Sequence, residues 1–186
     1  MQYVEVEQKF RLLSPPEELK ATLAARGARP GTPSRQVDSY FNAPHRDFLA
    51  AENISEWLRI RVEDESASLN FKRWYPLEEK IKTHCDEFET TVADAEAVQR
   101  TLAALDFIPL TVVDKVREEW HADGIAVAFD TVAGLGNFIE FEFKGDAGTV
   151  AEATARIEKF IGSLGIELGE RINAGYPHMA LGIHPS

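Results

Sequence analysis

The amino-acid sequence predicts an α+β fold of about eight, mostly antiparallel, β-strands with a few amphipathic helices packed against them. Three observations support this prediction. Polar and apolar residues alternate along several segments, amphipathic segments with helix caps lie among them, and Asp123-Gly124 joins two neighbouring segments as a hairpin turn would. The helices can cover the apolar face of such a sheet, whereas the pattern leaves open whether the other face meets water or is rolled inward.

The strand candidates are defined by the alternation. The first runs from Tyr3 to Leu12, with apolar residues on one face and charged residues on the other, because successive side chains of a strand point to opposite sides. The further candidates are Gln36–Phe41, Ser55–Glu63, Ser68–Trp74, Cys85–Val92, Val112–His121, Ile125–Thr131 and Asn137–Lys144.

The first helix is expected to begin at Ser14, whose side chain can cap it, with Glu17 completing a capping box. It carries Leu19 and Leu23 inward and ends near Gly27.

Two more helices and a short final one are expected further along the chain. One is capped by Asp94 and buries Val98, Leu102 and Leu105. The next begins near Thr149 and ends at Gly165, a residue that readily adopts a positive φ. Its buried residues are Ile157, Phe160, Ile161 and Leu164, and the short final helix follows Asn173.

The composition is that of an ordinary globular protein with an acidic surplus. The 186 residues, 44% hydrophobic and 27% charged, fit a single domain spanning 1–186. A formal net charge of −11 argues against sequence-independent binding of nucleic acid, which depends on Lys and Arg. It leaves room for a local basic pocket that takes a small anion, and for acidic sites that take a divalent cation.

The sequence also leads to an expectation about location. Cys85 is the single cysteine, which excludes an internal disulfide and fits a reducing compartment. The first residues lack the pattern of a signal peptide, and no apolar stretch approaches the roughly 20 residues that span a bilayer. We therefore expect a cytoplasmic protein that does not contact a membrane.

Charged residues occupy alternate positions on the polar faces of the predicted strands, so neighbours two residues apart point the same way. An ordinary water-facing sheet explains such a pattern. If the sheet closes, the charges instead face one another, and they either neutralise one another or await a ligand carrying both signs. A metal–triphosphate is such a ligand, since Arg and Lys bind phosphate while carboxylates hold Mg²⁺ or Mn²⁺. The residues concerned are Glu5, Glu7, Lys9, Arg59, Arg61, Glu63, Lys72, Glu87, Glu89, Lys115, Arg117, Asp130, Glu140, Glu142 and Lys144.

The segment Glu5-Val6-Glu7-Gln8-Lys9 resembles the ExExK signature of the CYTH superfamily. That superfamily joins class IV adenylyl cyclases, thiamine triphosphatases and other triphosphate tunnel metalloenzymes. The run from Phe41 to Phe48 resembles the class IV cyclase-like branch in particular. The other matching motifs, in order, are Asp38-Ser39-Tyr40-Phe41, Leu58-Arg59-Ile60-Arg61, Leu69-Asn70-Phe71-Lys72, Glu87-Phe88-Glu89, Lys115-Val116-Arg117-Glu118, and Asp130 through Gly134-Leu135-Gly136 to Glu142.

The resemblance implies an eight-stranded antiparallel β-barrel, a triphosphate tunnel with amphipathic helices outside, which holds a triphosphate and one or two divalent metals. It assigns phosphate binding to Lys9, Arg59, Arg61, Lys72, Lys115 and Arg117. It assigns the metal to Glu5, Glu7, Asp130, Glu140 and Glu142, with Glu87 and Glu89 as additional carboxylates of the lumen. The strand parity places the same residues on the inner face.

The leading functional expectation is metal-dependent hydrolysis of a triphosphate: tripolyphosphate, thiamine triphosphate or a nucleoside triphosphate. Glu5 and Glu7 are candidates for positioning the attacking water, and Lys9 is the third catalytic candidate. The first alternative is a class IV adenylyl cyclase that forms cyclic AMP and pyrophosphate from ATP. The second is a protein that binds polyphosphate or a nucleotide without catalysis. A homodimer is plausible for this fold.

Two further positions carry open alternatives. Trp57 is a candidate for stacking on an adenine or thiamine ring, and a structural role is the alternative. Near the C-terminus, relatives of the cyclase-like branch often have a Ser-Tyr motif followed by an acidic residue. Here Gly175 stands in place of the serine, Tyr176 persists, and Pro177-His178 follows. The role of that segment in closing the end of the tunnel is therefore open.

Overall fold

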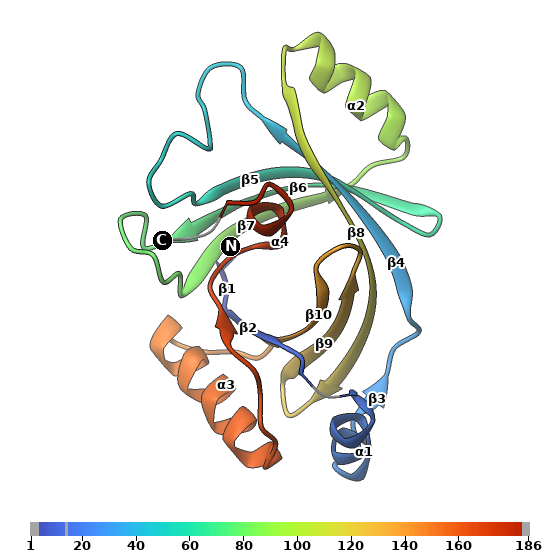
Figure 1. Ribbon diagram of the computed structural model, residues 1–186, viewed down its shortest axis with the longest axis vertical. Coiled ribbons are helices and arrows are strands. Elements are labelled where there is room, and N and C mark those ends of the chain that lie inside the picture. Colours follow the sequence, from blue (N-terminus) through green and yellow to red (C-terminus); the bar gives the residue numbers. More distant parts are fainter. Residues whose placement is uncertain (1–3, 14, 184–186) are drawn as a thin grey trace. The chain divides into compact units, whose positions relative to one another are not determined.

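The computed structural model describes residues 4–13 and 15–183, which form two compact units (Figure 1). The first unit comprises the described residues of Met1–Val4, Arg35–Lys115 and Ala174–Ser186. The second comprises Glu5–Ser34 and Val116–Asn173.

The first unit is built on antiparallel strands whose register aligns oppositely charged residues. The order β7–β6–β5–β4 pairs Asp38 with Arg61 and Lys72 with Glu87 as cross-strand neighbours. Helix α2 packs on the apolar face through Leu102, which meets Phe41 and Ile60. The elements of this unit are β4 (Ser34–Asn42), β5 (Glu56–Glu63), β6 (Ser66–Tyr75), β7 (His84–Thr91), α2 (Ala95–Ala104), the first part of β8 (Ile108–Ala122) and α4 (Tyr176–Ala180).

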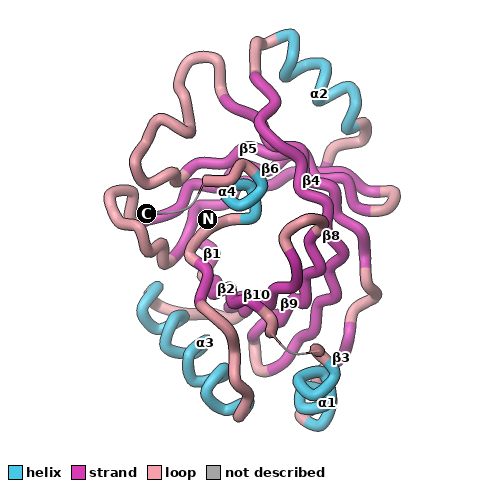
Figure 2. Tube along the Cα trace, viewed as in Figure 1, coloured by secondary structure: helices cyan, strands magenta, loops and turns pink. Residues whose placement is uncertain are grey.

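The second unit has the order β9–β10–β2–β11, again antiparallel, with the later part of β8 beside β9 (Figure 2). The short strand β3 pairs with β8. The elements are β1 (Val4–Glu5, at the boundary of the units), β2 (Glu7–Arg11), α1 (Glu17–Ala25), β3 (Arg29–Pro30), β9 (Ile125–Val132), β10 (Gly136–Phe143), α3 (Val150–Leu164) and β11 (Arg171–Ile172).

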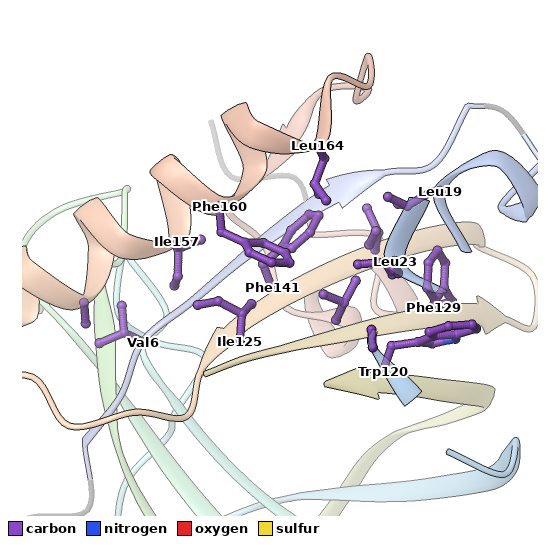
Figure 3. Packing of buried hydrophobic residues seen from close by; sticks show 14 residues of the cluster. Val6, Leu19, Leu23, Trp120, Ile125, Phe129, Phe141, Ile157, Phe160 and Leu164 are labelled. Carbon is purple, nitrogen blue, oxygen red and sulfur yellow. The ribbon is translucent and has the colours of Figure 1, made fainter. Parts of the chain in front are cut away.

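Helices α1 and α3 cover the apolar face of the strands in the second unit (Figure 3). Ile157 and Phe160 of α3 pack toward Phe141, while Leu23 of α1 packs near Phe129. Each such side chain contributes about 1.5–3 kcal/mol relative to an exposed one. Because side chains alternate along a strand, the charged positions lie on the opposite face of these same strands.

The predicted fold class, α+β with antiparallel strands and amphipathic helices packed on them, is confirmed. Among the described residues there are eleven strands rather than eight, but β1, β3 and β11 are two residues long, too short to show a period. The remaining eight correspond to the eight predicted segments. The predicted first strand is interrupted at Val6, and its first residue, Tyr3, lies outside the described residues.

Most helix ends agree with their predicted caps. The Asp94 side chain accepts a hydrogen bond from the Ala97 N–H at 2.9 Å, Thr149 caps α3, and Gly165 ends α3 with a φ of 65°. One prediction is wrong: Leu105 is exposed, because it follows the last residue of α2 and so leaves the packed face.

The start of α1 also differs from the prediction. The helix begins at Glu17 with Pro16 at the N-cap position, and no side chain caps it. The predicted cap, Ser14, lies outside the described residues.

Candidate functional site

A buried acid joins the two arginines of β5 in the first unit. Asp38 lies opposite Arg61 across the β4–β5 pair, and Tyr40 lies opposite Arg59, so side chains of both strands meet on one face. Arg61 donates through Nε and Nη2 to the two Asp38 oxygens at 2.7 and 2.8 Å, and Arg59 Nη1 donates to Oδ2 at 3.1 Å. The Asp38 residue is 1% exposed.

Electrostatics keep this cluster ionised and cationic. Burial alone would raise the pKa of Asp38, but attraction to Arg59, the hydrogen bond and charge of Arg61, and the charge of Lys115 hold it well below its ordinary value. Burial would lower the pKa of Arg59, and attraction to Asp38 and Tyr40 raises it instead. Two guanidinium groups thus share one carboxylate and retain a positive charge.

One donor of this cluster is unsatisfied among the described residues. The Nε atom of Arg59 is buried and has no hydrogen-bond partner there. Buried donors are nearly always paired, and a bound acceptor such as a phosphate oxygen would pair this one. The first unit therefore has a half-buried basic site suited to an anion.

Lys72 of β6 lies beside a carboxylate of β7. Its Nζ atom is 3.5 Å from Glu87 Oε1, to which Asn70 donates at 2.5 Å. Glu89, two residues further on, is exposed and accepts a hydrogen bond from Ser68 at 2.9 Å. Glu87 is thus half-buried in the basic cluster, whereas Glu89 lies toward solvent.

Helix α4 contributes two aromatic contacts. His178 packs on Trp57 edge-to-face with ring centroids 4.7 Å apart, and Tyr40 packs on the same indole at 5.8 Å. The Lys115 ammonium lies 5.1 Å from the Tyr176 ring centroid. Trp57 is 5% exposed, and its role in stacking on an adenine or thiamine ring stays a prediction.

The charged face of the second unit carries a second cluster, in which bases and acids meet directly. Lys9 Nζ is 2.9 Å from Glu140 Oε1, its cross-strand neighbour on β10. Arg117 contacts both oxygens of Asp130, at 2.7 and 2.5 Å, and also reaches Glu140. Lys9 and Asp130 are buried, so these charges are not those of an ordinary water-facing sheet.

The negative charges of these carboxylates change the pKa of Lys9. Burial would lower the pKa of this ammonium, but attraction to Glu140, Glu7 and Asp130 raises it above its ordinary value. Lys9 is therefore a cation at neutral pH although its residue is 7% exposed. Attraction to Glu142 and Glu5 likewise outweighs burial and raises the pKa of Lys144.

The remaining carboxylates fit a hard cation by their chemistry. Glu142 lies directly opposite Glu7 across β10 and β2, an arrangement of like charges that is unfavourable without a compensating cation. Lys144 approaches Glu142 to 2.6 Å. Mg²⁺ and Mn²⁺ favour such oxygen ligands. Within residues 4–13 and 15–183, however, no three His, Cys, Asp or Glu side chains are arranged as a metal site, and bases contact several of the carboxylates instead.

The structure therefore groups the predicted residues by unit. The basic candidates Arg59, Arg61, Lys72 and Lys115 belong to the first unit with Trp57, Glu87 and Glu89. The second unit contains Glu5, Glu7, Lys9, Arg117, Asp130, Glu140 and Glu142. Sequence reasoning gave no role to Asp38, Asn70 or His178. Asp38 stood in a matched motif, but its partners are apparent only from the strand register.

Fold and charged clusters define the class, an α+β protein whose antiparallel strands bury ionic side chains on one face. The chain belongs to the CYTH domain family, which it matches over residues 4–176. No helix of the described segments has the length and apolar character needed to cross a membrane.

One protein of related sequence and two solved structures are similar to this chain. A protein of Methanocaldococcus jannaschii with an adenylate cyclase name is 35% identical over 107 residues, and the match covers 58% of each chain. A solved structure from Pyrococcus horikoshii is 26% identical, covers 97% of this chain and 99% of its own, and has a TM-score of 0.77. A Hippeastrum protein with an adenylyl cyclase name and a described dominant triphosphatase activity shares the fold at 17% identity, with a TM-score of 0.67 and coverage of 98% and 96%.

Proposed function

We propose that the protein is a metal-dependent triphosphatase. The observation that carries the proposal is the half-buried pair of Arg59 and Arg61. This pair keeps a positive charge beside Asp38, and its buried Arg59 Nε donor has no partner among the described residues. Membership of the CYTH family supports the same conclusion, because its members include triphosphatases.

The basic residues would bind the phosphate oxygens through charge-assisted hydrogen bonds and neutralise the charge that develops on the leaving group. We assign this role to Lys9, Arg59, Arg61, Lys72, Lys115 and Arg117. The carboxylates of Glu5, Glu7, Asp130, Glu140 and Glu142 would hold Mg²⁺ or Mn²⁺. That ion supplies further charge neutralisation on the phosphate oxygens. Glu5 or Glu7 would orient the water that attacks the terminal phosphorus and accept its proton.

Tripolyphosphate is the substrate that we propose first. His178 and Tyr40 pack against Trp57, whose residue is 5% exposed, so this indole offers little open surface to a base or thiamine ring. Thiamine triphosphate and nucleoside triphosphates are the further candidates.

We also propose that residues 1–186 act as one cytoplasmic domain. A homodimer is a further proposal, which gel filtration tests.

Adenylyl cyclase activity is the second candidate. It is favoured by the M. jannaschii relative with an adenylate cyclase name, at 35% identity over 107 residues. The same basic residues would bind ATP, but the ribose 3′-hydroxyl would attack the α-phosphorus and pyrophosphate would leave.

Product analysis decides between these activities. The protein is incubated with tripolyphosphate, thiamine triphosphate or ATP, each with Mg²⁺ or Mn²⁺. Phosphate release establishes a triphosphatase, cyclic AMP with pyrophosphate establishes a cyclase, and tight binding without either product establishes a binding protein.

The site assignment is tested with Lys9→Ala and Glu140→Gln. We expect each to lower kcat/KM by about a hundredfold, the usual scale for removing one group that stabilises a transition state. His121→Ala is the control, because its exposed side chain lies outside both clusters. The assignment is wrong if both variants keep their metal-dependent turnover.

A further inference from the structure

Asp38 poses a problem for a phosphate site. It is an acid among the bases that the proposed function assigns to phosphate, and attraction to those bases lowers its pKa, so it is an anion at neutral pH. A fixed negative charge beside phosphate weakens phosphate binding through repulsion. The side chain of Asp38 contacts Arg59 and Arg61, so its effect on phosphate binding acts through these neighbours.

The contacts show what Asp38 does to the two arginines. Arg61 directs Nε and Nη2 at the carboxylate in the two-pronged geometry that fixes the guanidinium plane, which leaves Nη1 outside the pair. Arg59 directs Nη1 at the same carboxylate, while its buried Nε lacks a partner among the described residues. Tyr40 lies opposite Arg59 across the β4–β5 pair, and its side chain helps to raise the pKa of this arginine.

Holding long side chains in place matters for affinity. An arginine that is free to rotate loses side-chain entropy when it binds a ligand, whereas one already fixed in the folded protein does not. Asp38 is 1% exposed, so its carboxylate contacts the arginines from the interior of the protein and not from solvent.

We propose that Asp38 is a positioning residue, which holds Arg59 and Arg61 in the orientation that binds the phosphate chain without touching the substrate itself. The inference rests on the proposed function. Its rival is that Asp38 only neutralises charge. The two ideas predict opposite changes in the dissociation constant when the charge of Asp38 is removed. Loss of positioning weakens triphosphate binding, whereas loss of a negative charge strengthens it.

The main variant is Asp38→Asn, which keeps the size of the side chain and removes its charge. The dissociation constant for tripolyphosphate is measured by calorimetry with a chelator present, and KM and kcat are measured with Mg²⁺. We expect Kd and KM to rise about tenfold to a hundredfold, the scale of a charge-assisted hydrogen bond, while kcat changes by less than about threefold.

Asp114→Asn is the matched control. Asp114 forms the same two-pronged pair with Arg35, at 2.9 and 2.6 Å, but this pair lies at the surface of the same unit. Exposed ion pairs contribute little, so we expect Kd and KM to stay within about twofold of wild type. Asp38→Glu restores the charge and should recover part of the affinity.

Tyr40→Phe is the second variant, because Asp38→Asn can fail to fold. It removes the hydroxyl group of the residue opposite Arg59, which helps to raise the pKa of that arginine, and it keeps the Asp38–Arg61 pair. We expect Kd to rise about threefold. Thermal unfolding shows which variants are folded.

The outcomes separate the two proposals. A folded Asp38→Asn variant with unchanged or tighter binding overturns the positioning role, and so does an unchanged Tyr40→Phe variant if Asp38→Asn does not fold. Wild-type protein that binds tripolyphosphate without releasing phosphate overturns hydrolysis alone, and the Kd comparison still decides on Asp38. Wild-type protein that does not bind tripolyphosphate overturns both.

Discussion

At the scale of single residues, the contact between His178 and Trp57 bears most on substrate choice. The Gly175 N–H donates to His178 Nδ1 at 3.2 Å, which fixes the imidazole at the start of α4. The fixed ring then covers an indole that would otherwise be able to stack on an aromatic substrate. The residue that follows Tyr176-Pro177 therefore has a defined contact.

We predict that His178→Ala shifts the substrate preference toward ring-bearing triphosphates. Removing the imidazole uncovers Trp57, and stacking on an aromatic side chain contributes about 0.5–1.5 kcal/mol beyond area burial. The ratio of kcat/KM for thiamine triphosphate to that for tripolyphosphate should rise about threefold to tenfold. His121→Ala serves as control, and an unchanged ratio in the His178 variant would refute the prediction.

The sequence could not reveal this contact. Strand parity correctly places Lys9 and Glu140 on one face, because a period of two fixes direction within each strand. The alternation of side chains along a strand does not show which residue from a distant part of the chain packs on a particular side chain. Trp57 and His178 lie far apart in the chain, and their contact depends on where the five-residue helix α4 packs.

At the scale of elements, β2, β9, β10 and the later part of β8 hold acids and bases in mutual ion pairs. Arg117 contacts Asp130 and Glu140, and Lys9 contacts Glu140. The roles that we propose require these partners to separate, because a metal would take the carboxylates and phosphate would take the bases. Phosphate therefore withdraws the bases that compete with the metal for the carboxylates, and the metal withdraws the carboxylates that compete with phosphate for the bases.

We predict that metal and triphosphate bind cooperatively. Calorimetric titration of Mg²⁺ should give a Kd about fivefold to a hundredfold lower with tripolyphosphate present than without it, after correction for metal chelation by tripolyphosphate itself. The gain must be reciprocal, because linkage is symmetric for binding. Arg117→Gln should strengthen binding of Mg²⁺ alone and reduce the coupling, and independent binding of the two ligands in wild type would contradict this scheme.

The elements themselves were largely predictable. Asp94, Thr149 and Gly165 mark helix ends by local chemistry that does not depend on distant contacts, and the structure agrees at all three. Pro16 shows where prediction of helix ends from local sequence fails. Its fixed φ suits the start of a helix, and α1 begins after Pro16, later than the predicted cap at Ser14 indicated.

At the scale of the whole molecule, the described chain consists of two units with separate apolar cores. The larger cluster lies in the second unit beneath α1 and α3, and the smaller one joins α2 to β4 and β5 in the first. The charged clusters of the second unit lie on the same strands as its larger core, so the stability of that core supports the candidate site.

We predict that Ile157→Ala destabilises the protein by about 2–5 kcal/mol, because Ile157 is fully buried and its truncation leaves a cavity. Val116→Ala, at an exposed position of β8, should change the free energy of unfolding by no more than about 0.5 kcal/mol. Chemical denaturation measures both. Equal effects of the two substitutions would show that the α3 interface contributes little.

Strand β8 has a consequence for dividing the gene. Lys115 ends one unit and Val116 begins the next within one uninterrupted strand. A cut at this boundary gives two fragments that each end in half a strand, with unpaired backbone groups at the break. Lys115 and Arg117, two residues apart, would then be encoded on different fragments. Split reporters and truncations of this protein therefore belong in its loops, such as the one joining α2 to β8.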